Sequence, residues 1–137
     1  MFINRSGRKS PSGGYYLHIG PEGDSFAGGG VYMPEPAVLD RLRSEIDEHY
    51  FEWRSIVSSE AFCSAFHEGV LPSGMLKRSP KGYDGASPAV EYLKYKGYYT
   101  RRLLSDSEVK TPEFSGELAA LFQTVKLMVD FLNRSIG

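Results

Sequence analysis

The stretch GGYYLHIGPEGDSFAGGGVYMPEP, residues 13–36, decides the fold of this 137-residue chain. The segment Tyr15–Ile19 is short and rich in aromatic and aliphatic residues, which is typical of a strand. The turn-forming run GPEGDS separates it from a second apolar run, Phe26–Met33. Two strands joined by so short a connection predict an antiparallel hairpin over residues 15–33.

The glycines of this hairpin do not form a nucleotide-binding loop. A dinucleotide site needs a third glycine at fixed spacing and a helix directly after the loop, and the triplet Gly28–Gly30 has neither. The pair Gly69 and Gly74 has the spacing of a phosphate loop, but Met75 replaces the lysine that reaches the phosphates. Glycines inside a strand instead predict a bulge, or a place where a neighbour packs directly on the backbone.

Amphipathic helices account for most of the chain after the hairpin. Pro36 suits the first turn of a helix, and residues 38–46 carry apolar side chains at helical spacing. Four further elements are predicted: a helix over 50–59, a short helix capped by Ser59, a helix opened by Ser87 and Pro88, and a third strand over 97–104.

The final helix has the clearest pattern. A capping box, SDSE at 105–108, and then Thr111-Pro112 precede it. Apolar residues then recur at one helical face: Phe114, Leu118, Leu121, Phe122, Val125, Met128, Val129 and Leu132. We therefore expect an α+β fold over a single domain, residues 1–137, in which helices back a small antiparallel sheet and the long C-terminal helix lies in the core.

Composition excludes several classes of protein. The formal net charge is −1, which gives no general attraction to nucleic acid or to anionic membranes. The opening MFINRSGRKS lacks the apolar segment of a signal peptide, and no apolar run is long enough to cross a bilayer. The single cysteine fits a reducing compartment. We expect a cytoplasmic protein with no membrane or nucleic-acid partner and no cofactor.

Catalytic and metal-binding patterns are weak. Cys63 and His67 are four residues apart on a predicted helix, so one hypothesis is that they form a nucleophilic thiolate–imidazole pair. Cys63 lies between Phe62 and Phe66, however, which favours a buried and inert thiol. Three histidines and one cysteine at unrelated spacings predict no metal site.

The remaining candidates are basic and aromatic. Residues 77–102 hold seven basic residues and two acidic ones, which predicts a basic surface for an anionic ligand or, alternatively, an ordinary solvated face. His18 lies beside Tyr16 on one face of the first hairpin strand, where it either lines a pocket or has a structural role. The candidate ligand-binding residues are His18, Tyr16, Lys81, Lys96, Arg102 and Arg78.

Four short motifs, YYLHIGPEG, GGGVYMPEP, SPKGYD and LKYKGYY, resemble a bacterial family known as domain of unknown function 2461. The similarity runs from about Gly14 to the final helix. It implies an α+β fold and no established activity. The matching positions are His18, Gly28 to Gly30, Pro34, Pro36, Lys81, Gly82, Lys96 and Arg102, while Leu103 replaces a proline often found in the family.

The family's defining R-D-x-R-F motif is absent from this chain. The resemblance therefore implies that the chain corresponds to the C-terminal portion of a longer fold, with a strand at MFI. We expect a non-catalytic module with a basic surface. The alternatives are an enzyme for a phosphorylated or acidic substrate, completed by upstream residues, and a purely structural interaction domain. A sheet edge left uncovered near the N-terminus predicts a dimer.

Overall fold

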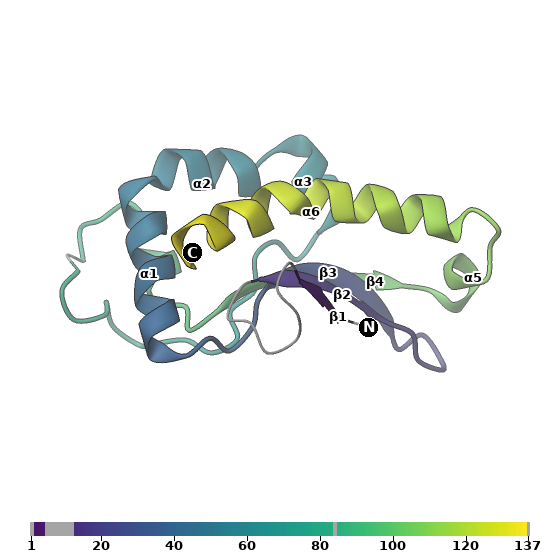
Figure 1. The fold of residues 1–137 in the computed structure, drawn as a ribbon, viewed down its shortest axis with the longest axis horizontal. Helices are drawn as coiled ribbons and strands as arrows, with labels where there is room; N and C mark the ends of the chain where they lie inside the picture. Colours follow the sequence, from purple (N-terminus) through teal and green to yellow (C-terminus); the bar gives the residue numbers. More distant parts are fainter. Residues whose placement is uncertain (1, 5–12, 84, 137) are drawn as a thin grey trace.

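A computed structural model describes residues 2–4, 13–83 and 85–136. One antiparallel sheet of four strands, in the order β1-β2-β3-β4, packs against helices on one side only (Figure 1). The elements in chain order are β1 (Phe2–Asn4), β2 (Gly14–His18), β3 (Ser25–Val31), α1 (Pro36–Glu48), α2 (Tyr50–Val57), α3 (Glu60–Ala65), α4 (Val90–Leu93), β4 (Tyr98–Leu104), α5 (Asp106–Val109) and α6 (Phe114–Ile136). The predicted α+β class is confirmed.

The hairpin is confirmed as β2 and β3. Gly14 pairs with Gly30 and His18 with Phe26, so the register spans both strands. The turn between them is closed by the Asp24 N–H, which donates to the Pro21 carbonyl at 3.1 Å, and Gly23 supplies a left-handed φ of +79°. The predicted strand at the N-terminus is also present, because β1 pairs antiparallel with β2.

The glycine triplet lets α6 lie directly on the sheet. A Cβ atom on Gly29 would come within 3.2 Å of Val129 Cγ2 and 3.3 Å of Val125 Cγ1, so these two side chains pack on bare backbone. Gly30 has a φ of +137°, a conformation that other residues rarely adopt. The triplet is therefore a packing surface, as the strand context predicts.

The predicted helix starts are confirmed at two serines. The Ser59 side chain accepts a hydrogen bond from the Phe62 N–H at 3.2 Å and caps α3. Ser105 and Glu108 form the complete capping box of α5. This short helix ends at Val109, and α6 then begins separately at Phe114.

The core lies between the sheet and the helices, and α6 is its central element. Trp53 on α2 is fully buried and meets Tyr98 of β4 edge to face at 5.9 Å and Phe131 of α6 at 5.3 Å. The buried residues of α6 all lie in its second half: Val125, Met128, Val129, Phe131, Leu132, Asn133 and Ile136. The sequence predicted burial along the whole stripe, and this is wrong for its first half, where Phe114, Leu118, Leu121 and Phe122 are only half-buried.

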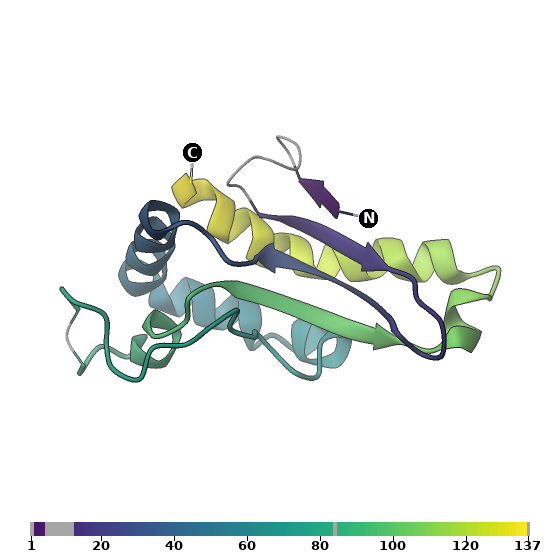
Figure 2. The same ribbon diagram turned by 90° about the horizontal axis from the view of Figure 1, so that it is seen from below.

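Among the described residues, no helix covers the opposite face of the sheet. Seen from below, strands β2, β3 and β4 lie in front of α6 (Figure 2). Three large apolar residues on or beside this face are exposed: Tyr32 (56%), Met33 (69%) and Leu103 (61%). We call it the outer face of the sheet.

Candidate functional site

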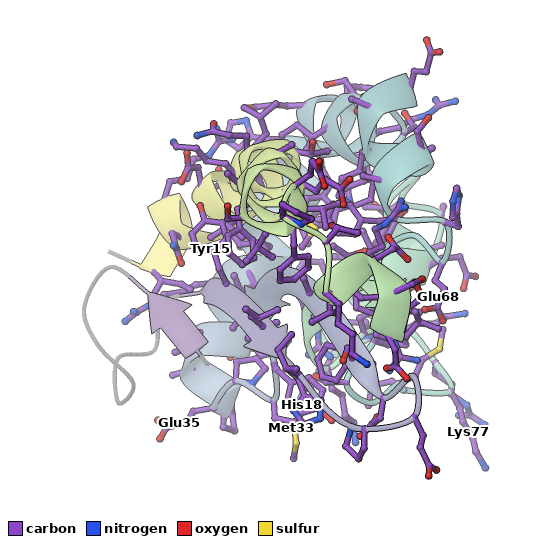
Figure 3. The ribbon with its side chains drawn as sticks, turned by 90° about the vertical axis from the view of Figure 1, so that its right-hand side faces the viewer. Tyr15, His18, Met33, Glu35, Glu68 and Lys77 are labelled. Atoms are coloured by element: carbon purple, nitrogen blue, oxygen red, sulfur yellow. The ribbon has the colours of Figure 1, made fainter. Side chains whose placement is uncertain are left out.

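Two of the sequence-predicted residues, Tyr16 and His18, lie on the outer face of the sheet. The Tyr16 hydroxyl donates to the Gly30 carbonyl at 2.9 Å, and burial raises the pKa of this phenol. His18 is exposed, stacks on Phe26 at 5.2 Å and lies 3.3 Å from the Asp24 carboxylate. It points away from α6, as Figure 3 shows. Both side chains thus have local partners within the hairpin.

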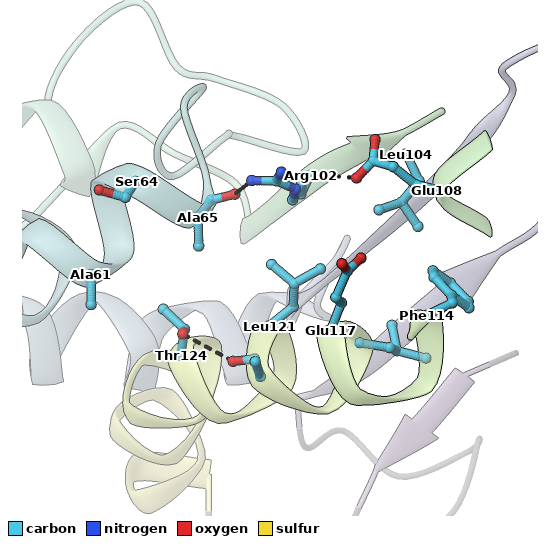
Figure 4. A pocket seen from close by; sticks show the side chains of 12 residues that line it. Ala61, Ser64, Ala65, Arg102, Leu104, Glu108, Phe114, Glu117, Leu121 and Thr124 are labelled. Carbon is cyan, nitrogen blue, oxygen red and sulfur yellow. Dashed lines mark hydrogen bonds and ion pairs between the residues drawn. The ribbon is translucent and has the colours of Figure 1, made fainter. Parts of the chain in front are cut away.

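The predicted basic residues do not gather beside His18. Arg78 and Lys81 are exposed and belong to the loop of residues 77–83, at the opposite end of the molecule from the hairpin turn (Figures 1 and 2). Lys96 is also exposed, and its aliphatic stem packs beside Gly74 just before β4. Arg102 lies on the face of β4 that is turned toward α3 and α6 (Figure 4). The six predicted ligand residues are therefore spread over several surfaces.

A cleft of about 400 Å³ opens where Arg102 lies, and we call it the main cleft (Figure 4). One wall is the first half of α6, with Phe114, Leu118 and Leu121. The other wall is α3, with Ala61 and Ala65. These mostly apolar walls explain why the start of α6 is only half-buried: its stripe faces a cleft instead of a packed neighbour.

The charged side chains of the main cleft differ in the contacts that they make. Arg102 makes two long contacts, from Nη1 to the Ala65 carbonyl at 3.5 Å and from Nη2 to Glu108 Oε2 at 3.9 Å. Glu108 is held by the capping box, because its Oε1 accepts the Ser105 N–H at 3.1 Å, and this hydrogen bond lowers the pKa of the carboxyl. Glu117 lies on the α6 wall and is exposed.

A second and smaller cleft, of about 210 Å³, adjoins the first, and we call it the side cleft. Ala65 and Arg102 line both clefts, so the two lie side by side. The remaining lining residues of the side cleft are His67, Glu68, Arg101 and Leu103. Arg101 Nε lies 3.3 Å from Glu68 Oε1. Four of the six residues that line the side cleft are thus polar or charged, against five of the twelve that line the main cleft.

The expectation that Cys63 is buried is wrong. Phe62 and Phe66 are each 1% exposed, but Cys63 is exposed, and its thiol lies 3.8 Å from the Val57 carbonyl. Residues four apart share a helix face, whereas the next residue is rotated by about 100°. Since α3 ends at Ala65, His67 lies beyond the helix and the spacing that would bring it onto Cys63 does not apply.

Sequence reasoning missed the main cleft. Its walls come from α3 and α6, which are far apart in sequence, and small residues such as Ala61 and Ala65 carry no chemical signal. The available signal was the apolar stripe of α6, which continues through Leu118 and Phe114 beyond the region that the sheet needs. Arg102 was the one predicted ligand residue that lies in this cleft.

The described residues contain neither a metal-binding cluster nor a membrane-spanning helix. Over residues 2–4, 13–83 and 85–136, no three histidine, cysteine, aspartate or glutamate side chains come together as a metal site. In the same part of the chain, no helix is both long enough and apolar enough to cross a membrane.

A family model described as "conserved hypothetical protein (DUF2461)" matches residues 1–131 of the chain. The chain belongs to the DUF2461 family. The match starts at residue 1, so it includes β1 as well as the segment from Gly14 that the motifs indicated. Comparison with curated proteins gave no match, and neither did comparison with solved structures. DUF2461 membership leaves the biochemical function open, so the clefts have to be interpreted from their own chemistry.

Proposed function

We propose that this domain is a non-catalytic binding module for a small amphipathic molecule with an anionic end. The apolar body of the ligand lies in the main cleft, and its anionic group meets Arg102. The size of this cleft is within the range of small-molecule sites, which are mostly apolar with a few convergent polar groups. A cytoplasmic location in a bacterium is part of the proposal and is supported by the single cysteine.

The observation that carries the proposal is the incomplete pairing of Arg102. A guanidinium has five N–H donors in a planar fork, and the two contacts of Arg102 are at 3.5 and 3.9 Å. A ligand carboxylate or phosphate offers short bidentate contacts that neither Ala65 nor Glu108 provides in this geometry. Glu108 does not compete strongly with a ligand for Arg102, because its other oxygen accepts a hydrogen bond from the Ser105 N–H.

The test is a binding series on matched ten-carbon probes below their micelle-forming concentrations. Decanol reports on the apolar walls, decanoate adds the anion, and decylamine replaces it with a cation that would suit Glu117. We expect decanoate to bind about tenfold more tightly than decanol, which is the lower end of the value of a charge-assisted hydrogen bond. Decylamine should bind most weakly.

Two variants separate the guanidinium from general electrostatics. Arg102→Gln should reduce decanoate binding to the level of decanol and leave decanol unchanged. Arg54→Gln removes an exposed arginine on α2, outside the cleft, and should change neither value. Tighter binding of decylamine than of decanoate would contradict the proposal, and so would the absence of binding by all three probes.

A second proposal concerns the outer face of the sheet, for which we propose self-association into a two-fold dimer. The exposed residues Leu103, Tyr32 and Met33 support it, because an uncovered apolar face on a soluble domain is a common interaction surface. A two-fold axis lets the same face cover itself. The oligomeric state tests this proposal independently of the main cleft.

A further inference from the structure

The side cleft exists because the chain after α3 separates from the edge of β4. Leu71 and Tyr99 form an isolated bridge in which each N–H donates to the other carbonyl, at 2.6 and 3.1 Å. Before this bridge, Gly69 adopts a left-handed φ of +71°. The contacts that continue toward Arg101 are made by side chains, from Thr100 Oγ1 to the Gly69 carbonyl at 2.7 Å and from Arg101 to Glu68.

This separation leaves backbone groups of β4 facing the side cleft. In a strand, the N–H and C=O groups of alternate residues point to the same side. The Tyr99 groups point outward to Leu71, so those of Arg101 and Leu103 point outward as well. In the described chain, the segment opposite supplies no backbone partner to either residue. The edge therefore presents two N–H donors beside two guanidinium groups.

The charge of the side cleft favours an anion with several acceptor oxygens. Two arginines, Arg101 and Arg102, line it against one carboxylate, Glu68, and His67 adds ring nitrogens that can form hydrogen bonds. The Glu68 side chain is 43% exposed and holds Arg101 through a single contact, so it can rotate into solvent. A phosphate monoester carries three terminal oxygens and a charge of about −1.5 to −2 at neutral pH. The phosphate can therefore accept hydrogen bonds from Arg101, from Arg102 and from a backbone N–H at the edge of β4 at the same time. A carboxylate has only two oxygens.

We propose that the side cleft binds a phosphate monoester and that the ligand of this domain is a phosphorylated amphiphile. The ligand's phosphate lies in the side cleft and its apolar body in the main cleft, with Arg102 between them. This inference rests on the proposed function for the apolar body. The two clefts share Ala65 and Arg102 in their lining, which places the two proposed parts of the ligand next to each other.

The test compares decyl phosphate with decanoate by titration, followed through backbone amide resonances. Decyl phosphate should bind about tenfold more tightly, as expected for one additional charge-assisted contact. Arg101→Gln should remove this advantage and leave decanoate binding unchanged, because Arg101 does not line the main cleft. Arg54→Gln is again the control for loss of a positive charge.

Inorganic phosphate alone separates the two proposals. It should shift the Arg101 and Leu103 amide resonances of the full chain, and Arg101→Gln should abolish these shifts. Equal affinity for decyl phosphate and decanoate would overturn the inference, as would equal weakening of both by Arg101→Gln. If the amphiphiles fail to bind while inorganic phosphate still shifts these amides, the apolar part of the proposed function fails and the phosphate site stands.

Discussion

The two halves of α6 have the same amphipathic sequence pattern and different surroundings. The second half packs on Gly29 of the sheet and against Trp53, and its apolar residues except Leu127 are buried. The first half extends past that core, and Leu118 and Leu121 face the main cleft. An apolar stripe therefore shows which face of a helix avoids water, but not whether a packed neighbour or an empty cleft lies opposite it.

Polar contacts distinguish the two halves as clearly as burial does. In the second half, the buried Asn133 amide bonds both backbone groups of Gly13, and Arg134 pairs with Glu45 of α1 and Glu52 of α2. The Arg134 guanidinium also lies 4.4 Å from the Phe131 ring. The C-terminal half is thus tied to the sheet and to two helices. The first half is connected mainly through its apolar contacts around the cleft.

The largest expected difference comes from a matched pair of substitutions. Leu132→Ala removes a fully buried side chain and should lower the free energy of unfolding by about 2–5 kcal/mol. Leu121→Ala removes a half-buried side chain at the cleft and should cost only about 1 kcal/mol, half the value of a full burial. Chemical denaturation measures both. Equal losses would mean that the first half of α6 contributes to the core as much as the second.

The Asn133 link should give the next largest effect. Asn133→Ala leaves the buried N–H and C=O of Gly13 without these partners, which should cost about 1–3 kcal/mol. The exposed Gln123, in the first half of α6, provides the control. Gln123→Ala should change the free energy of unfolding by less than about 0.5 kcal/mol. Hydrogen exchange of the Gly13 amide checks the mechanism, because the exchange should accelerate in the Asn133 variant alone.

Two lysine substitutions decide what the exposed apolar surfaces are for. Leu103→Lys places a charge on the outer face and should convert a dimer into a monomer, as measured by light scattering over a dilution series. Leu118→Lys places the same charge in the main cleft and should abolish binding of decanol, the probe of its apolar walls, while the dimer persists. A parent protein that is monomeric at high concentration contradicts the dimer. Loss of the dimer in Leu118→Lys alone would show that copies meet through α6 and not through the sheet.

The smallest effect concerns the capping box that leads into the first half of α6. The Ser105 backbone N–H lowers the pKa of Glu108 below its ordinary value of 4.5. The charged carboxylate therefore stabilises the fold above this value, and the contribution is lost as the pH falls through the lowered pKa. Glu108→Gln keeps a hydrogen-bond acceptor without the charge. The variant should be slightly less stable at neutral pH and should approach the parent below pH 4.5, in paired denaturation curves.

Local patterns predicted the elements of the fold well. The hairpin followed from turn residues between two apolar runs, and the capping box at Ser105 followed from spacing alone. Each of these features depends on neighbours within a few residues, and for that reason the sequence contains the information.

The candidate site was much harder to predict from the sequence, because it depends on which distant segments of the chain meet. Seven basic residues within 77–102 suggested one patch, yet some lie in a loop, and Arg101 and Arg102 leave β4 on opposite faces and line the same side cleft at the edge of the sheet. Alternation along a strand predicts that neighbouring side chains leave it on opposite faces. It does not show that β4 lies at an edge, where both side chains can line one cleft. Cys63 shows the same limit, since its aromatic sequence neighbours occupy a different side of the helix.

The position of α6 on Gly29 has a consequence for synthesis in the cell. Strands β2 and β3 and helices α1 and α2 emerge from the ribosome long before the residues of α6 that cover them. The Gly13–Asn133 link joins residues 120 positions apart, so it forms only after nearly all of the described chain has been translated. Until then, the nascent chain exposes both the inner face of the sheet and the apolar sides of the early helices. Apolar surface exposed in this way is prone to aggregation until α6 covers it.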